Sequence, residues 1–194
     1  MQRPLGNPTD RWQRILSFDD NVLSEIHRDS SATLLGLLTV FAAMAASGLG
    51  GFLWWVVEGN PGKVDFLLES TIMGTLIATA LFFVWAGLVG ASAGQLGRQE
   101  VLAATVRTIS YASFPFAVSF FFFIPGLEYP ITLLAVALLV LSTTLATRVS
   151  LGLSFGRALG SNLIGFFLWA LILTQLMEPG GYFAPAIFVW GAFA

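Results

Sequence analysis

The stretch that decides the fold is residues 33–57, TLLGLLTVFAAMAASGLGGFLWWVV. It contains no Asp, Glu, Lys, Arg or His, and it is long enough for a helix to cross about 30 Å of hydrocarbon, which takes about 20 residues. Asp29 precedes it as a candidate N-cap, and Pro61 follows its end. This stretch predicts a transmembrane helix.

Four further stretches lack ionisable side chains in the same way. They are residues 70–94, 108–124, 131–147 and 160–177. Within the third, Pro115 removes one backbone hydrogen bond, so we expect a kink there. The pattern predicts an all-α protein, an integral membrane bundle of five transmembrane helices.

The composition excludes whole classes of function. Of the 194 residues, 56% are hydrophobic and only 10% are charged, against about 25% charged in a soluble domain. The surface of such a chain would aggregate in water, which excludes a soluble enzyme and a nucleic-acid-binding protein. The chain has no cysteine, which excludes disulfides, thiolate metal sites and cysteine nucleophiles.

The basic residues are divided unevenly between the two sides of the predicted spans. Every arginine lies in residues 1–32, in the connection from the second span to the third, or in that from the fourth to the fifth. Lys63 is alone on the opposite side. By the positive-inside rule the N-terminus is cytoplasmic and the C-terminus is outside. We expect the chain in a prokaryotic cytoplasmic (inner) membrane.

The sequence divides into a leader at 1–32, a membrane domain at 33–177 and an apolar tail at 178–194. The leader has the pattern of an amphipathic helix in the membrane interface, broken near Ser17 and Phe18. An alternative is a leader that only positions the first span. We expect the tail to lie in the outer interface or against a partner. The residues expected to contact lipid headgroups are Arg11, Trp12, Arg14 and Arg28.

The polar residues of the spans indicate structural roles rather than chemistry. No span contains an ionisable group of the kind that proton-coupled transporters carry. Asn162 and Gln175 are expected to form interhelical hydrogen bonds, and His27 is expected to be a solvated surface residue. The acids of the outer loops, such as Glu58 and Asp65, match no metal-binding motif. We therefore predict no catalytic residue, no metal site and no cofactor.

Small residues recur at four-residue spacing, which lets helices approach closely. Two readings stay open: packing between spans of one chain, and contact with a second protein. The candidates for helix packing or partner contact are Ser47, Gly51, Gly90, Gly94, Gly156 and Gly160, together with Trp190 of the tail.

Two segments carry a resemblance to a known family. Residues 15–33 (ILSFDDNVLSEIHRDSSAT) form an amphipathic leader that runs into the first span, and residues 105–124 (TVRTISYASFPFAVSFFFFI) open the third. The matching positions are Arg107, Tyr111, Ala112, Pro115, Pro125, Gly126, Ser154, Arg157 and Ala158. In these features the chain resembles prokaryotic proteins of the Yip1 domain family. The resemblance implies five spans, a cytoplasmic N-terminus and no agreed catalytic site; eukaryotic members are associated with small GTPases and vesicle trafficking.

The function expected from these observations is an accessory or scaffolding one. We expect a non-catalytic, multi-pass protein that organises the membrane or docks on a larger membrane complex. Its expected partners are membrane lipids and another integral membrane protein, with no nucleic acid. The alternative is a passive conduit for a small neutral or apolar compound, which needs no ionisable group on its path.

Overall fold

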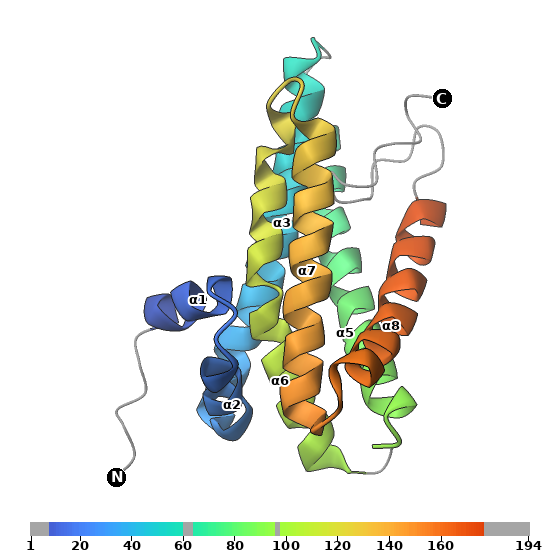
Figure 1. Cartoon of the computed structure of the whole chain (residues 1–194). Coiled ribbons are helices and arrows are strands. Elements are labelled where there is room, and N and C mark those ends of the chain that lie inside the picture. The colour runs from blue at the N-terminus through green and yellow to red at the C-terminus, as the bar shows by residue number, and fades with distance from the viewer. Residues whose placement is uncertain (1–7, 60–63, 96–97, 177–194) are drawn as a thin grey trace.

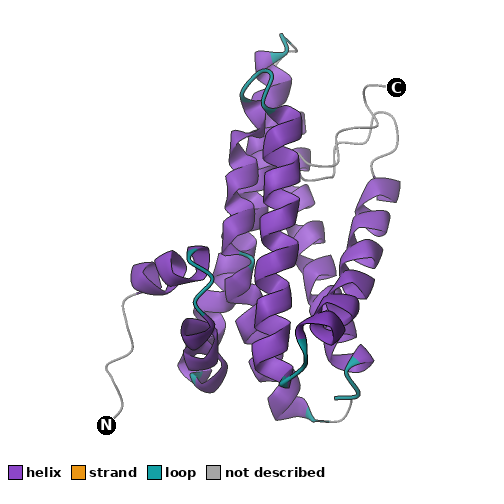
Figure 2. Cartoon of the chain, viewed as in Figure 1, coloured by secondary structure: helices purple, strands orange, loops and turns teal. Residues whose placement is uncertain are grey.

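The computed structural model describes residues 8–59, 64–95 and 98–176. Within these ranges the chain is helical and has no strand (Figure 2). The elements are α1 (Pro8–Leu16), α2 (Asp20–Arg28), η1 (Ser30–Ala32), α3 (Thr33–Val57), α4 (Val64–Leu67), η2 (Leu68–Met73), α5 (Gly74–Ser92), α6 (Gln99–Ala112), η3 (Phe114–Phe123), α7 (Glu128–Leu151) and α8 (Phe155–Leu176). The expectation of an all-α chain is confirmed for this part.

Five helical stretches are long and apolar enough to cross a membrane. The first of them contains α3, whose bounds are those predicted. The third begins at Gln99 rather than at residue 108, α7 extends beyond the predicted bounds at both ends, and α8 begins five residues earlier than predicted. The prediction kept every charged residue outside the spans. A helix need not end there, because an arginine is tolerated in the turn that leaves the apolar layer.

Pro115 changes the type of helix in the third span. The α-helix α6 ends at Ala112, and η3 continues as a 3-10 helix with Pro115 in its first turn. Proline has no N–H to donate to the carbonyl four residues earlier, and its ring clashes with that carbonyl, so the α-helix stops. The expected kink at Pro115 is thus a junction between two helix types.

The third span is the centre of the bundle. Its two parts, α6 and η3, pack against α3 and α7, and α6 also contacts α5; α8 packs against α5 and α7 at the edge (Figure 1). In the most apolar stretch of the third span 61% of the residues are buried, whereas in that of α8 only 33% are buried. A central helix therefore carries much of the packing, and α8 leaves most of its surface open.

Close approach between the spans depends on two glycines without a predicted role. A Cβ added to Gly50 would lie 2.5 Å from the carbonyl oxygen of Phe120, and one added to Gly165 would lie 2.0 Å from Trp85 Cδ1. Gly50 thus lets α3 lie against the backbone of η3. This contact gains dispersion energy that a larger residue would block.

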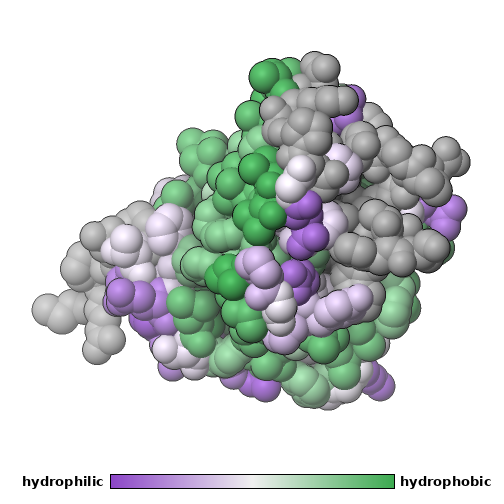
Figure 3. All heavy atoms as spheres, turned by 90° about the horizontal axis from the view of Figure 1, so that it is seen from above, coloured by the Kyte–Doolittle hydropathy of each residue, from purple (hydrophilic) through white to green (hydrophobic). Residues whose placement is uncertain are grey.

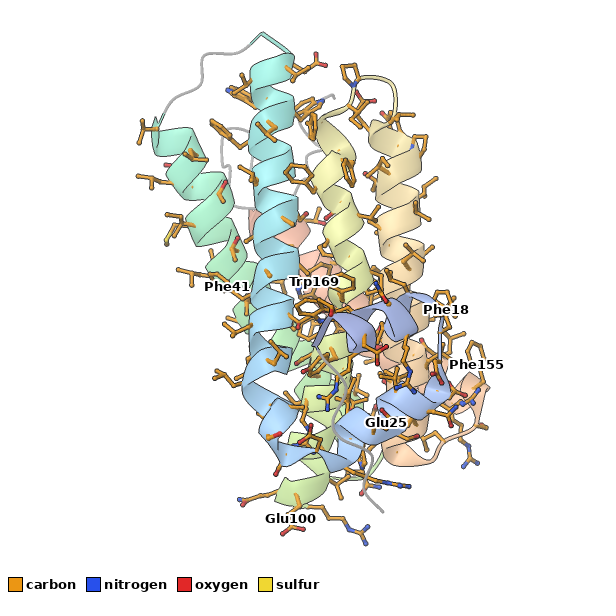
Figure 4. The ribbon with its side chains drawn as sticks, turned by 90° about the vertical axis from the view of Figure 1, so that its left-hand side faces the viewer. Phe18, Glu25, Phe41, Glu100, Phe155 and Trp169 are labelled. Carbon is orange, nitrogen blue, oxygen red and sulfur yellow. The ribbon has the colours of Figure 1, made fainter. Side chains whose placement is uncertain are left out.

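The N-terminal helices lie against the outside of the bundle rather than away from it (Figure 4). The chain turns between them at Phe18, whose φ of 53° is left-handed, so the predicted break near Ser17 and Phe18 is confirmed. Ile15, Val22 and Ile26 are buried. The apolar faces of α1 and α2 are therefore covered by protein.

The exterior of the long helices is largely apolar. Large hydrophobic side chains are exposed on α3, α5, η3, α7 and α8, and green covers much of the described surface in the view of Figure 3. Examples are Leu34, Leu76, Leu133 and Phe167. An exterior of this kind fits a hydrocarbon surrounding.

We expect the change Gly50→Ala to lower the melting temperature of the detergent-solubilised protein. The added methyl group would overlap backbone at Phe120, and overpacking of this kind costs about 1–3 kcal/mol. The matched control is Gly87→Ala, also within a long helix, where no described atom lies within 4 Å of the added Cβ. Circular dichroism melts of the two variants check this, and an equal effect of both substitutions would contradict it.

Candidate functional site

A buried arginine of α6 joins the N-terminal helices to the bundle. Arg107 is 7% exposed. Its Nε donates to the carbonyl of Ile26 at 2.9 Å, one Nη donates to the carbonyl of His27, and the other Nη donates to the Thr33 hydroxyl at 3.1 Å. The last turn of a helix has carbonyls without helical partners and carries partial negative charge. Arg107 therefore caps α2 from another helix.

A second buried charge is paired in the same region. An Nη of Arg11 lies 2.8 Å from Asp29 Oδ2, and the two side chains are 6% and 10% exposed. The other oxygen of Asp29 accepts the backbone N–H of Ser31, which caps η1. Burial acts against the charged form, but the hydrogen bonds from Ser31 and Arg11 outweigh it and lower the pKa of Asp29. The carboxylate stays ionised and fixes the turn from α2 into α3.

His27 is partly buried, which corrects the expectation of a solvated surface residue. Burial lowers its pKa, and the charges of Arg107 and Arg28 lower it further. The imidazole is therefore neutral at pH 7. The single histidine of the chain is a packed residue at the end of α2.

The contact of α1 with the bundle is aromatic. The ring of Trp12 stacks on Phe114 of η3, with a centroid distance of 5.2 Å and an interplanar angle of 10°. Its indole N–H lies 3.4 Å from the hydroxyl of Thr39 on α3. Trp12 is thus held by two elements of the bundle at once.

Three of the four residues expected to contact lipid headgroups make contacts within the protein, and headgroup contact by the set stays a prediction. Arg11 is buried and paired, Trp12 is packed on Phe114, and Arg14 forms ion pairs with Asp19 and Glu25. Of the expected set, Arg28 is exposed and stays a prediction. An amphipathic sequence does not distinguish the two cases, because its apolar face is buried equally well by lipid or by protein.

The strongest polar group within the spans is fully engaged. Asn162 of α8 has no exposed surface. Its side-chain oxygen accepts the indole N–H of Trp85 at 3.1 Å, and its amide nitrogen donates to the hydroxyls of Thr143 and Thr144 at 2.9 Å and 3.0 Å. The expected interhelical hydrogen bond is confirmed: Asn162 links α8 to both α5 and α7. Gln175, by contrast, is exposed.

Aromatic rings surround this polar link. Trp85 packs against Phe82, Phe166 and Trp169, with centroid distances of 5.1, 5.6 and 5.8 Å. The indole N–H of Trp169 donates to the carbonyl of Ala78 at 3.1 Å. The core where α5, α7 and α8 meet is therefore apolar and filled apart from the paired groups.

Three of the predicted packing residues lie inside the bundle. Ser47, Gly51 and Gly90 are buried, and a Cβ at Gly90 would meet Leu102 Cδ2 at 2.3 Å. Gly94 is different: it is exposed, with φ of 71°, just beyond the end of α5. It therefore terminates the helix rather than packing it, since glycine adopts the left-handed conformation without a steric penalty.

Gly156 and Gly160 face outward. Both are exposed, and no described atom lies within 4 Å of a Cβ added to either. They lie one turn apart on α8, the least buried span, and because neither has a side chain they leave a shallow depression on its surface. Trp190 and the tail 178–194 lie outside the described residues.

The described residues contain no cluster of three or more His, Asp or Glu that could hold a metal ion. Searches against family models, curated proteins and solved structures find no match to this chain. The resemblance to the Yip1 domain family is therefore still a prediction.

We expect the change Arg107→Met to release α1 and α2 from the bundle. It removes the donor to the carbonyl of His27 and leaves the carbonyl of Ile26 with only the backbone N–H of Asp29, at a cost of about 1–3 kcal/mol. Hydrogen exchange followed by mass spectrometry should show faster exchange in residues 8–28, with α7 still protected. Arg98→Met, at an exposed position before α6, is the control. Unchanged protection of α2 in Arg107→Met would contradict the capping role.

Proposed function

We propose that the chain is a non-catalytic, five-span accessory or scaffolding protein of a prokaryotic cytoplasmic membrane. Its N-terminus lies in the cytoplasm, and it docks on another integral membrane protein. The support for a membrane location is the set of five apolar helices with an apolar exterior. The support for membership of a Yip1-like family remains the short motifs of the sequence.

The orientation is supported by where the arginines gather. Arg28 ends α2, Arg98 precedes α6, Arg148 is in the last turn of α7, and Arg157 is in the first turn of α8. These element ends lie at one end of the bundle (Figure 1). The positive-inside rule makes that end cytoplasmic.

The observation that favours docking over conduction is the engagement of Asn162. A residue that lines a solute path offers hydrogen bonds to the solute. Asn162 instead uses both its side-chain oxygen and its amide nitrogen in hydrogen bonds to neighbouring helices. Thr75, another polar residue of the spans, donates its hydroxyl to the carbonyl of Thr71. Gln175 is exposed whereas Asn162 is fully buried, so the two side chains do not line one interior path.

The surface that best suits a partner is the outer face of α8. Gly156 and Gly160 let a second helix approach its backbone, and packing is the main source of affinity between helices in a bilayer. Exposed Phe155 and Ile164 add apolar area on the same span. This face needs no polar group to bind another transmembrane helix.

The orientation predicts which positions react with an impermeant thiol reagent on whole cells. The chain has no native cysteine, so single cysteines can be placed at Lys63, Arg98, Arg157 and Ala194. We expect labelling at Lys63 and Ala194, and labelling at the two arginine positions only after the cells are opened. Labelling of Arg98→Cys in intact cells would reverse the orientation.

The docking role predicts that Gly160→Leu reduces co-purification of a partner at least tenfold in mild detergent. A Cβ added at Gly160 has no described atom within 4 Å, so we expect the bundle to keep its melting temperature when leucine fills this open face of α8. Gly87→Leu, exposed on α5 with equally open space, is the matched control. Asn162→Ala, once shown to be folded, should still bind the partner.

If the protein is a conduit instead, the two variants should give the opposite results. In that case Asn162→Ala would abolish the flux of a small neutral solute into reconstituted vesicles, while Gly160→Leu would leave every association unchanged. That pair of results would replace the docking function by the conduit.

A further inference from the structure

A groove lies between α1 and two elements of the bundle, α3 and η3. Its volume is about 220 Å³, and its walls come from α3, η3 and Trp12 of α1. Small side chains, Ala42 and Ala117, make room on the two bundle elements. The stacked rings of Trp12 and Phe114 form one side of the space.

The walls of the groove offer no free polar group. Thr39 is its one hydroxyl, and that hydroxyl donates to the carbonyl of Leu35 at 2.7 Å and lies 3.4 Å from the indole N–H of Trp12. The other lining side chains are Leu, Ala and Phe. A cavity lined in this way does not hold water well, because water needs two or more polar partners. The occupant must therefore be apolar.

The position of the groove decides what that occupant is. Its floor belongs to the first and third candidate spans, and the neighbouring side chains Leu34, Leu38 and Phe41 are 67%, 52% and 44% exposed. This side of the bundle faces hydrocarbon if the chain crosses a membrane. The volume is below the roughly 300–1,000 Å³ of a site for a drug-sized ligand, which suits a narrow chain better than a compact molecule.

We propose that this groove binds one acyl chain of a membrane phospholipid, with Trp12 as the side wall that holds it in place. The proposal rests on the membrane location given above, but not on the docking role. The N-terminal helix then has a function that an ordinary lipid-facing surface lacks. It selects one lipid from the surrounding bilayer and keeps it against α3 and η3.

Native mass spectrometry of protein extracted in mild detergent tests the proposal. We expect the protein to retain one phospholipid and the variant Ala42→Phe to retain at least tenfold less, because phenylalanine fills the groove. The matched control is Ala137→Phe, an exposed alanine of α7 that does not line the groove. It should keep the lipid. Equal retention by Ala42→Phe and the unmodified protein would overturn the proposal.

A second measurement detects the bound acyl chain directly. In vesicles that contain dibromostearoyl phosphatidylcholine, the bromines quench nearby tryptophans. The emission lost on changing Trp12 to Phe isolates this residue from the others, and we expect it to be quenched. Its quenching should fall in Ala42→Phe and persist in Ala137→Phe. Lack of quenching in a protein with unchanged melting temperature would also overturn the site.

Two further outcomes separate the possible failures. A dimer that retains no lipid and that Ala42→Phe dissociates would assign the groove to a second copy of the chain and overturn the lipid site. Recovery of the protein without membranes would instead refute the membrane location itself. A membrane-bound protein with the expected cysteine labelling but no retained lipid refutes the groove alone.

Discussion

Polar groups inside this bundle must find their partners within the protein, because an apolar surrounding offers none. Arg107 meets this constraint at one end of the bundle by donating to the last turn of α2, and Asn162 meets it among α5, α7 and α8. Ser142 of α7 bonds to the carbonyl of Ala112 at 2.6 Å, where α6 ends. Each of these polar groups ties together elements distant in sequence. The arrangement of helices follows from where these few hydrogen bonds can be made.

The sequence predicted the spans well, because length and the absence of charge are local properties. The bounds of α3 and the turn at Phe18 were predictable for this reason. The start of the third span was not, since Arg107 was read as a residue of a solvated connection. Its partners lie on α2, far away in the chain. The close contacts of Gly50 and Gly165 also depend on which backbone lies opposite, and no spacing within one helix encodes that.

The proposed docking surface and the proposed lipid groove lie on different sides of the molecule for one physical reason. Asn162, the strongest polar group of the spans, uses its side chain within the bundle, so the affinity proposed for the exterior comes from the shape of apolar surfaces. On α8 the exterior is open at Gly156 and Gly160, which suits another helix. Beside α3 it is hollowed under Trp12, which suits a flexible chain. The distribution of small residues on the exterior thus distinguishes the surface that suits a partner helix from the groove that suits an acyl chain.

The 3-10 helix η3 also sets the length of the central span. A 3-10 helix rises about 2.0 Å per residue and an α-helix about 1.5 Å. The 10 residues of η3 therefore extend about 5 Å further than they would as α-helix. The η3 part of this span thereby covers a given length with fewer residues than an α-helix would need. As an α-helix the same residues would end about 5 Å earlier, and successive phenyl rings would be about 20° closer together around the helix axis.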